Sequence, residues 1–331
     1  MKKITMCRTI GVLAGAGLLL SAGTAVAEAP KAQVELAQAQ PKVVLAMSGW
    51  TGFAPFTLAR EKGLHRKHGI DFEIKKMPPQ ARHAAMAAGE VHAISTTIDT
   101  HITYVAANVP VTQVLVIDSS TGGDGVLVKG AIRSFADLKG KSVAVDNPGA
   151  VSNFWFNYLL KKNGMSMKDV RASNMGPQPA ANAFAAGQFD AAVTYEPYMS
   201  GALKSFAEGR VLLSSKDTPG IIIDTLAFQP DYVKANPKAV KAVVDMWFEA
   251  LALVKSDPDA NRVMGADVKQ SPEDFARSAA LVTWYDKAAN RDYFAKTIAP
   301  FMQEAADILL ETGVIKRMPD LKVMADDSFV K

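Results

Sequence analysis

The sequence predicts an α/β fold of two lobes joined by a double crossover, with a ligand cleft between the lobes. Three observations support this fold class. Short apolar runs alternate with helical patterns in two successive blocks, clusters of glycine, proline and serine interrupt the alternation twice, and a helical tail follows. Such alternation favours βα units and a largely parallel sheet, and a tail that packs back on the first block makes the chain cross between the lobes twice.

The first block has strands and helices in strict alternation. It begins with the apolar run KVVLAM at residues 42–47. The predicted strands are 42–47, 71–76, 92–96 and 111–118, and the predicted helices are 53–67, 79–88 and 99–107. We expect this block to form part of lobe one, over residues 42–120.

A Gly-Gly-Asp-Gly segment at residues 122–125 precedes the second block, which we assign to lobe two over residues 121–221. Its predicted strands are 125–128, 142–145, 170–174, 191–194 and 211–215. Its predicted helices are 150–163, 180–186 and one that Ser134 opens, with Asp137 as the capping partner. The crossings are expected near residues 119–125 and 214–224.

The tail returns to lobe one, over residues 222–331. After one more apolar strand, the sequence from residue 230 onward predicts only helices. These include 237–256, a helix with Ser271 at its N-cap and Pro272 in its first turn, and 299–311.

Residues 1–27 are typical of an export signal. Lys2, Lys3 and Arg8 precede an apolar stretch at residues 10–20, and Ala-Val-Ala at residues 25–27 is a small-x-small cleavage pattern. An uncleaved membrane anchor is the alternative interpretation. Cleavage would leave a loose leader at residues 28–41 and a protein that is exported to the periplasm.

Composition excludes several classes of protein. The single cysteine, Cys7, lies inside the predicted signal, so the exported chain would have no disulfide, thiolate metal site or cysteine nucleophile. The net charge of +4 falls to +1 without the three basic signal residues, and no basic arm indicates nucleic acid. No HExxH or GxSxG motif is present, so we expect neither catalysis nor a metal or other cofactor.

Candidate ligand contacts follow the strand ends of the first block. Trp50 lies in the glycine-rich turn at residues 48–52, where its ring either stacks on a planar or cationic ligand or fills the lobe. Thr97 and Asp99 either cap the helix that follows the third strand or face the cleft. Asp118 ends the fourth strand at the first crossover.

The second block and the return strand supply four more candidates. Ser152 lies in the turn that opens the helix at 150–163. Tyr195 and Glu196 lie in TYEPY at residues 194–198, where the following proline holds Glu196 extended. Glu196 either contacts the ligand or forms an interlobe or capping interaction. Asp224 lies in an apolar strand and therefore needs a partner.

Four ordered motifs in the chain are specific as a set: GWTGFAPFTLAREKGLHRKHGIDFEI (49–74), MAAGEVHAISTTIDT (86–100), SFADLKGKSVAV (134–145) and AFAAGQFDAAVTYEPYMS (183–200). With these motifs and its helical tail, the chain resembles the nitrate/sulfonate/taurine class of ABC-importer binding proteins. The resemblance covers residues 42–331 and implies a type II periplasmic-binding-protein fold, a small-molecule solute and a permease partner in the inner membrane. We expect a monomer.

Other stretches are similar to a branch of this class that is associated with urea carboxylase. They are SGWTGFAP (48–55), TTIDT (96–100), TYEPY (194–198), MGADVKQSPEDFA (264–276) and DKAAN (286–290). The branch implies guanidine or urea. The acids and aromatics at the strand ends, without Arg or Lys in those turns, favour guanidinium over an anion.

Other ligands and roles remain open. Urea, taurine or another sulfonate, nitrate and a thiamine-pyrimidine precursor are alternative ligands, and a periplasmic ligand-sensing module is an alternative role. Pyrimidine-precursor synthases resemble the same fold but use a cysteine-rich segment, so an enzyme is not expected.

Overall fold

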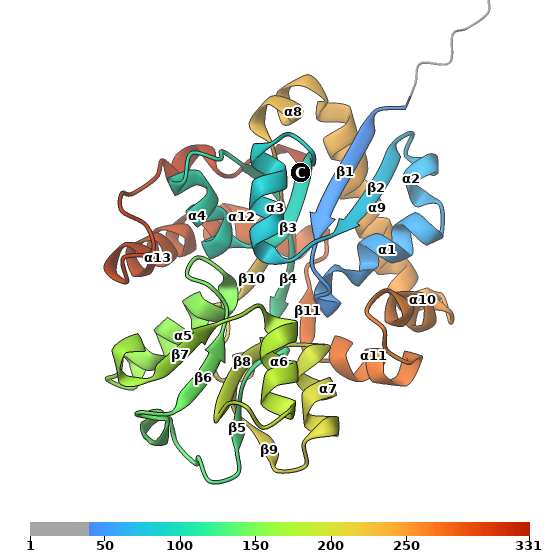
Figure 1. The fold of residues 1–331 in the computed structure, drawn as a ribbon. Helices are drawn as coiled ribbons and strands as arrows, with labels where there is room; N and C mark the ends of the chain where they lie inside the picture. Colours follow the sequence, from blue (N-terminus) through green and yellow to red (C-terminus); the bar gives the residue numbers. More distant parts are fainter. Residues whose placement is uncertain (1–39) are drawn as a thin grey trace, which may run out of the picture. The chain divides into compact units, whose positions relative to one another are not determined.

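The computed structural model describes residues 40–331 as one compact unit with two β-sheets (Figure 1). The predicted signal peptide at 1–27 and the leader up to residue 39 lie outside the described residues. Among residues 40–331, no helix is both long and apolar enough to cross a membrane.

The first sheet has six strands in the order β11-β4-β10-β3-β1-β2. β1 pairs in parallel with β2 and β3, whereas β10 is antiparallel to β3 and β4, and β11 is antiparallel to β4. The strands are β1 (Lys42–Met47), β2 (Asp71–Lys76), β3 (Ala93–Thr97), β4 (Thr112–Ser120), β10 (Ile223–Phe228) and β11 (Val282–Trp284).

The second sheet has five strands in the order β7-β6-β8-β5-β9. β6 pairs in parallel with β7 and β8, and β5 is antiparallel to β8 and β9. The strands are β5 (Asp124–Lys129), β6 (Ser142–Val145), β7 (Arg171–Asn174), β8 (Ala191–Tyr195) and β9 (Gly209–Ser214).

Both sheets are therefore mixed, and the prediction of a largely parallel sheet is wrong in this respect. Strands joined by helical crossovers run parallel, but β5 and β10 each enter their sheet directly from the other sheet. The chain leaves the first sheet after β4 and returns to it at β10, so the predicted double crossover is confirmed. Figure 1 shows the green and yellow middle of the chain around the second sheet, and blue and orange segments sharing the first.

The helices largely follow the sequence prediction. They are α1 (Ala54–Glu61), α2 (Leu64–Lys67), α3 (Pro79–Ala87), α4 (Ile98–Ala106), α5 (Val151–Lys162), α6 (Pro177–Ala185), α7 (Tyr198–Ser205), α8 (Pro230–Ala235), α9 (Pro237–Ser256), α10 (Ala260–Asp267), α11 (Pro272–Ala279), α12 (Lys287–Lys296) and α13 (Ile298–Glu311).

Two predictions about these elements are wrong. The helix expected over 53–67 is divided into α1 and α2, because Gly63 has a φ of +73°, which ends a helix. The tail expected to be all helical contains the three-residue strand β11, too short for an alternating pattern to reveal.

The capping predictions are confirmed. The hydroxyl of Ser271 accepts the amide of Asp274 at 3.1 Å at the start of α11. The short 3₁₀ helix at Phe135–Leu138 has the expected capping box, in which the Asp137 carboxylate accepts the amide of Ser134 at 2.9 Å.

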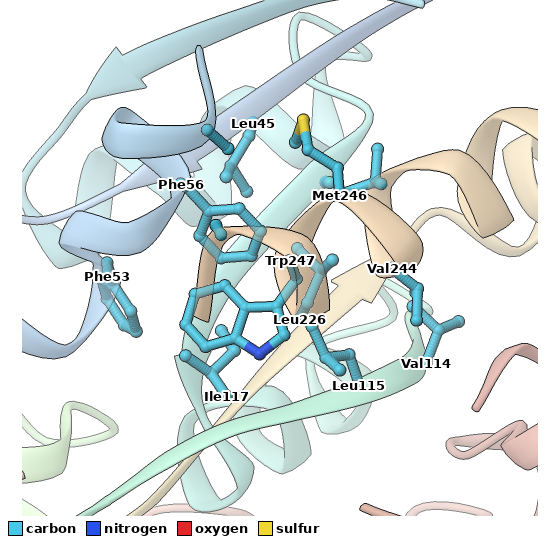
Figure 2. Packing of buried hydrophobic residues seen from close by; sticks show 14 of the residues in the cluster. Leu45, Phe53, Phe56, Val114, Leu115, Ile117, Leu226, Val244, Met246 and Trp247 are labelled. Atoms are coloured by element: carbon cyan, nitrogen blue, oxygen red, sulfur yellow. The ribbon is translucent and has the colours of Figure 1, made fainter. Parts of the chain in front are cut away.

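The return of the tail to the first sheet is secured by a core around α9. The rings of Trp247 on α9 and Phe56 on α1 have centroids 4.6 Å apart, and both side chains are fully buried (Figure 2). Leu45, Ile117 and Leu226 of the first sheet belong to the same cluster. Burial of an aromatic residue of this size stabilises the fold by about 2 kcal/mol or more, so this core secures α9 against the first sheet.

Candidate ligand-binding site

A pocket of about 380 Å³, its opening to solvent included, lies between the two sheets. It is lined by Ser48, Trp50, Phe53, Pro79, Arg82, Thr96, Thr97, Thr100, Asp124, Val151, Tyr195, Ile222 and Asp224. Ser48 follows β1, Thr97 ends β3 and Tyr195 ends β8, so both sheets contribute the carboxyl ends of strands. Ligands bind at this edge in α/β proteins.

Trp50 is fixed in the pocket wall by Asp118. Its indole Nε1 donates to Asp118 Oδ1 at 3.2 Å and lies 3.3 Å from Oδ2. The edge of the ring meets Tyr195, with centroids 5.7 Å apart and planes at 81°. A Cβ on Gly52 would lie 2.2 Å from Asp118 Oδ2, and one on Gly123 would lie 2.4 Å from the Trp50 ring. Only glycines at these two positions leave room for the indole and the carboxylate.

Asp118 and Asp224 face each other across neighbouring strands. They are register partners on β4 and β10, and both are buried. Burial raises the pKa of Asp118 to about 8, opposed by hydrogen bonds from Trp50 and Asp224. Burial, followed by the charges of Asp118 and Asp124, raises the pKa of Asp224 well above its ordinary value. Burial and the mutual repulsion of the two carboxylates therefore both favour protonation of the pair.

Asp124 is a pocket residue that the sequence interpretation missed. It begins β5 directly after the first crossing, is buried, and lines the pocket. Burial raises its pKa to about 7, while a hydrogen bond from the Ser120 side chain opposes the shift. The Gly-Gly-Asp-Gly segment was interpreted only as a boundary, although an acid at a crossing between lobes is itself a signal for a cleft residue.

Arg82 is the second pocket residue that was missed. It lies on α3, is only 3% exposed, and donates from Nη1 to the carbonyl of Ser95. Its buried Nε has no hydrogen-bond partner among the described residues. A charged residue on a helix is usually exposed, so sequence reasoning does not place this guanidinium in the pocket.

Four of the eight predicted site residues line the pocket: Trp50, Thr97, Tyr195 and Asp224. Asp118 lies behind them, in contact with Trp50. Asp99 is also buried behind the wall, and it accepts the Thr100 hydroxyl at 3.4 Å. Burial raises the pKa of Asp99 to about 7.

The other two predicted residues lie on the side of the second sheet. Ser152 is buried beside the lining residue Val151, and its hydroxyl has no partner among the described residues. The Glu196 carboxylate does not line the pocket. It accepts the hydroxyl of Ser200 on α7 at 2.7 Å and that of Ser278 on α11 at 3.4 Å, which joins the two halves of the molecule.

The pocket offers charged groups and hydrogen-bonding groups to a ligand. Within residues 40–331, no group of three or more His, Cys, Asp or Glu side chains could hold a metal ion. The buried carboxyl groups can accept N–H donors, Arg82 can donate, and the aromatic rings can cover a flat ligand.

Comparison with known proteins identifies relatives over most of the chain. The family described as NMT1/THI5 like matches residues 50–261. A protein of Brucella abortus (strain 2308) that is named a binding protein is 29% identical over 236 residues, which cover 68% of this chain and 70% of the relative. A Bacillus subtilis (strain 168) protein, named for binding aliphatic sulfonates, is 25% identical over 292 residues, or 84% of each chain.

Solved structures share the fold at lower identity. The alkanesulfonate-binding protein of Xanthomonas axonopodis pv. citri, bound to MOPS, superposes with a TM-score of 0.73 at 20% identity and covers 87% of this chain and 98% of its own. The periplasmic nitrate-binding protein of Synechocystis PCC 6803 gives a TM-score of 0.72 at 17% identity, over 87% and 86% of the two chains. The periplasmic-binding-protein fold and the class predicted from the sequence are thereby confirmed. The chain belongs to the NMT1/THI5-like family, as a substrate-binding protein and not as an enzyme.

Proposed function

We propose that the protein captures a small, planar, nitrogen-rich cation in the periplasm and delivers it to the permease of an ABC importer. Guanidinium is the best representative of this ligand class. Relatives that are named as periplasmic binding proteins support the location and the transport role, and the chemistry of the pocket supports the charge of the ligand.

The observation that carries the proposal is the excess of buried carboxyl groups around the pocket. Asp118, Asp124 and Asp224 lie at the strand ends beside Trp50, and Arg82 is the one cationic side chain among the lining residues. Buried carboxylates are costly without a partner, so a bound cation that replaces their protons is stabilised. A guanidinium offers paired N–H donors to Asp124 and Asp224, and a flat face to an aromatic ring.

In this proposal the ligand favours closure of two lobes, residues 42–120 with 222–331 and residues 121–221. Trp50, Thr97 and Asp224 would contact it from lobe one, and Asp124 and Tyr195 from lobe two. A ligand that binds both lobes shifts the population toward the closed state, which the permease would then recognise.

A second candidate ligand is a small anion or zwitterion, and Arg82 is the observation that favours it. The buried Nε without a partner is a donor to which a sulfonate, nitrate or carbonyl oxygen could bind. The relatives named for sulfonates and nitrate point the same way. A ligand of this kind would leave the acids protonated.

A thermal-shift panel on the purified protein separates these candidates. Low-millimolar guanidinium chloride, urea, taurine, sodium nitrate and a hydroxymethyl-pyrimidine are compared with matched sodium chloride. A ligand at about 100 times its Kd adds roughly 2.7 kcal/mol, a shift of several degrees. A rise in Tm with guanidinium supports the proposal, and a rise with taurine or nitrate alone rejects it in favour of the anion.

Matched variants test the carboxyl group itself. Asp224→Asn should abolish the guanidinium shift, because it replaces the pocket-lining carboxyl group with a neutral amide. Asp292→Asn on α12, where the exposed Asp292 pairs only with Lys296 at 3.0 Å, should leave the shift unchanged.

A further inference from the structure

The two segments that cross between the sheets are joined by a chain of buried side-chain hydrogen bonds. Ser120, at the end of β4, lies on the outgoing segment, and Ser215, directly after β9, lies on the returning one. Their hydroxyl oxygens are 2.7 Å apart. Ser120 also contacts the carboxylate of Asp124, which lines the pocket. We call Ser215, Ser120 and Asp124 the crossover bridge; all three are at most 3% exposed.

Backbone amides complete the bridge. The amide of Gly122 donates to Ser215 Oγ at 2.8 Å, and the amide of Asp124 donates to Ser120 Oγ at 3.1 Å. Both amides belong to the outgoing segment, while Ser215 belongs to the returning one. The Ser215 hydroxyl therefore holds the two segments at a fixed spacing.

The charge of Asp124 decides which group donates and which accepts in each hydrogen bond of the crossover bridge. Each serine hydroxyl has one proton to donate, and an ionised carboxylate only accepts. With Asp124 ionised, Ser120 must donate to Asp124, and Ser215 must then donate to Ser120. With Asp124 protonated, the carboxyl group can itself donate and the order is no longer fixed. Aligned hydrogen bonds strengthen one another, so ionisation of Asp124 tightens the link between the crossings.

We propose that the crossover bridge couples occupancy of the pocket to the two crossing segments, about which the lobes would close. A cation beside Asp124 keeps its carboxylate ionised, so the hydrogen bonds from Ser215 through Ser120 to Asp124 all point toward the ligand. The inference rests on the proposed function in one respect, which is the positive charge of the ligand. It assigns Ser120 and Ser215 as positioning residues that act on closure without touching the ligand.

The test uses Ser215→Ala and Ser120→Ala, with Ser142→Ala as the matched control. Ser142 also donates to a carboxylate, that of Asp190 at 2.8 Å, but it lies on β6 away from both crossings. Guanidinium affinity is measured by calorimetry, compaction on binding by small-angle X-ray scattering, and protection of the Gly122 amide by hydrogen exchange.

Each bridge variant should weaken guanidinium binding about fivefold, the effect of one hydrogen bond. Each should also reduce the compaction on binding, and Ser215→Ala should lower the protection of Gly122. Ser142→Ala should match the unmodified protein in all three measurements. Bridge variants that bind within twofold of the unmodified protein and compact equally would overturn the inference.

A ligand-free measurement separates failure of the inference from failure of the proposed ligand. If the unmodified protein does not bind guanidinium, a rise from pH 6 to pH 8 still ionises Asp124. Measured relative to the change in global stability over this pH range, the protection factor of Gly122 should then rise in the unmodified protein and in Ser142→Ala but stay constant in Ser120→Ala. Equal behaviour of all three proteins would reject the bridge, whatever the ligand is.

Discussion

The indole Nε1 of Trp50 lies 3.2 Å from Oδ1 of Asp118, which joins the turn after β1 to the end of β4. Because the indole donates to a carboxyl group, the bond favours the charged form of Asp118 and fixes the plane of the ring. The same carboxyl group meets Asp224 on the next strand. Asp118 therefore positions both Trp50 and Asp224, which line the pocket.

Trp50→Phe should weaken guanidinium binding by roughly fivefold, since it removes the hydrogen bond that holds the ring in the pocket wall. Calorimetric titration measures the change in Kd. Trp155→Phe is the control, because the Trp155 indole donates to the Thr218 hydroxyl at 2.8 Å, packs with residues of the second sheet and does not line the pocket. Equal losses of affinity in both variants would show that the effect is general destabilisation.

Gly52→Ala should abolish ligand-induced stabilisation. The added methyl group would lie 2.2 Å from Asp118 Oδ2 and 2.3 Å from Trp50 Nε1, so their hydrogen bond cannot form in its present geometry. Gly201→Ala in α7 is the control. It meets no atom within 4 Å and should add about 0.5–1 kcal/mol of stability. Thermal melts with and without guanidinium distinguish the two outcomes, and an unchanged shift in Gly52→Ala would contradict the proposed geometry.

Arg82→Gln separates a cationic from an anionic ligand. Removal of a like charge should tighten guanidinium binding by roughly fivefold, whereas a sulfonate or nitrate would lose its donor and bind more weakly. Lys76→Gln is the control, since Lys76 is paired with Asp267 at 2.6 Å and does not line the pocket. Weaker guanidinium binding in Arg82→Gln alone would count against the cation.

The ligand-free protein should become less stable as the pH rises from about 6.5 to 8. Burial raises the pKa of Asp118 to about 8 and that of Asp124 to about 7, so the folded chain holds protons that the unfolded chain releases near pH 4. Burial also lowers the pKa of His101 to about 3. Below pH 6.5 the unfolded chain therefore gains a proton on this histidine that the folded chain does not, so the effect of His101 on stability opposes that of the acids only below pH 6.5.

Thermal melts across this pH range check the sign. Tm of the ligand-free protein should fall with rising pH, the fall should be smaller in Asp118→Asn, and the guanidinium shift should be larger at pH 8 than at pH 6.5. A ligand-free Tm that rises between pH 6.5 and 8 would show that these acids are ionised without cost.

The fold was predictable because its pattern is local. The alternation of short apolar runs with helices identified strands such as β1 and β6 to the residue, and the two breaks located the crossings. The parallel or antiparallel direction of each strand was harder to predict, because it depends on how distant segments connect. β5 and β10 run antiparallel to their neighbours because each comes directly from the other sheet. β11 was missed because three residues, two of them partly or largely exposed, have no alternation to detect.

The lining of the candidate pocket was predictable only where residues follow strands or lie within them. Trp50, Thr97, Tyr195 and Asp224 come after or within strands, and the carboxyl ends of strands meet in one place. Arg82 lies on a helix, and helical periodicity does not show that a polar residue points inward. Glu196 follows a strand like the others, but Ser278, more than eighty residues away, engages its carboxylate. Such a partner cannot be found from spacing in the sequence.

β10 lies in the middle of the first sheet, between β3 and β4, yet it comes after every strand of the second sheet in the chain. During synthesis or export, the edges of β3 and β4 that pair with β10 therefore stay unpaired until residue 228 is available. The second sheet, built from the continuous segment 124–214, needs no such delay. We expect the second sheet to fold first and the first sheet to be completed last, when β10 pairs with β3 and β4. Slow refolding phases should therefore appear in probes placed near β10.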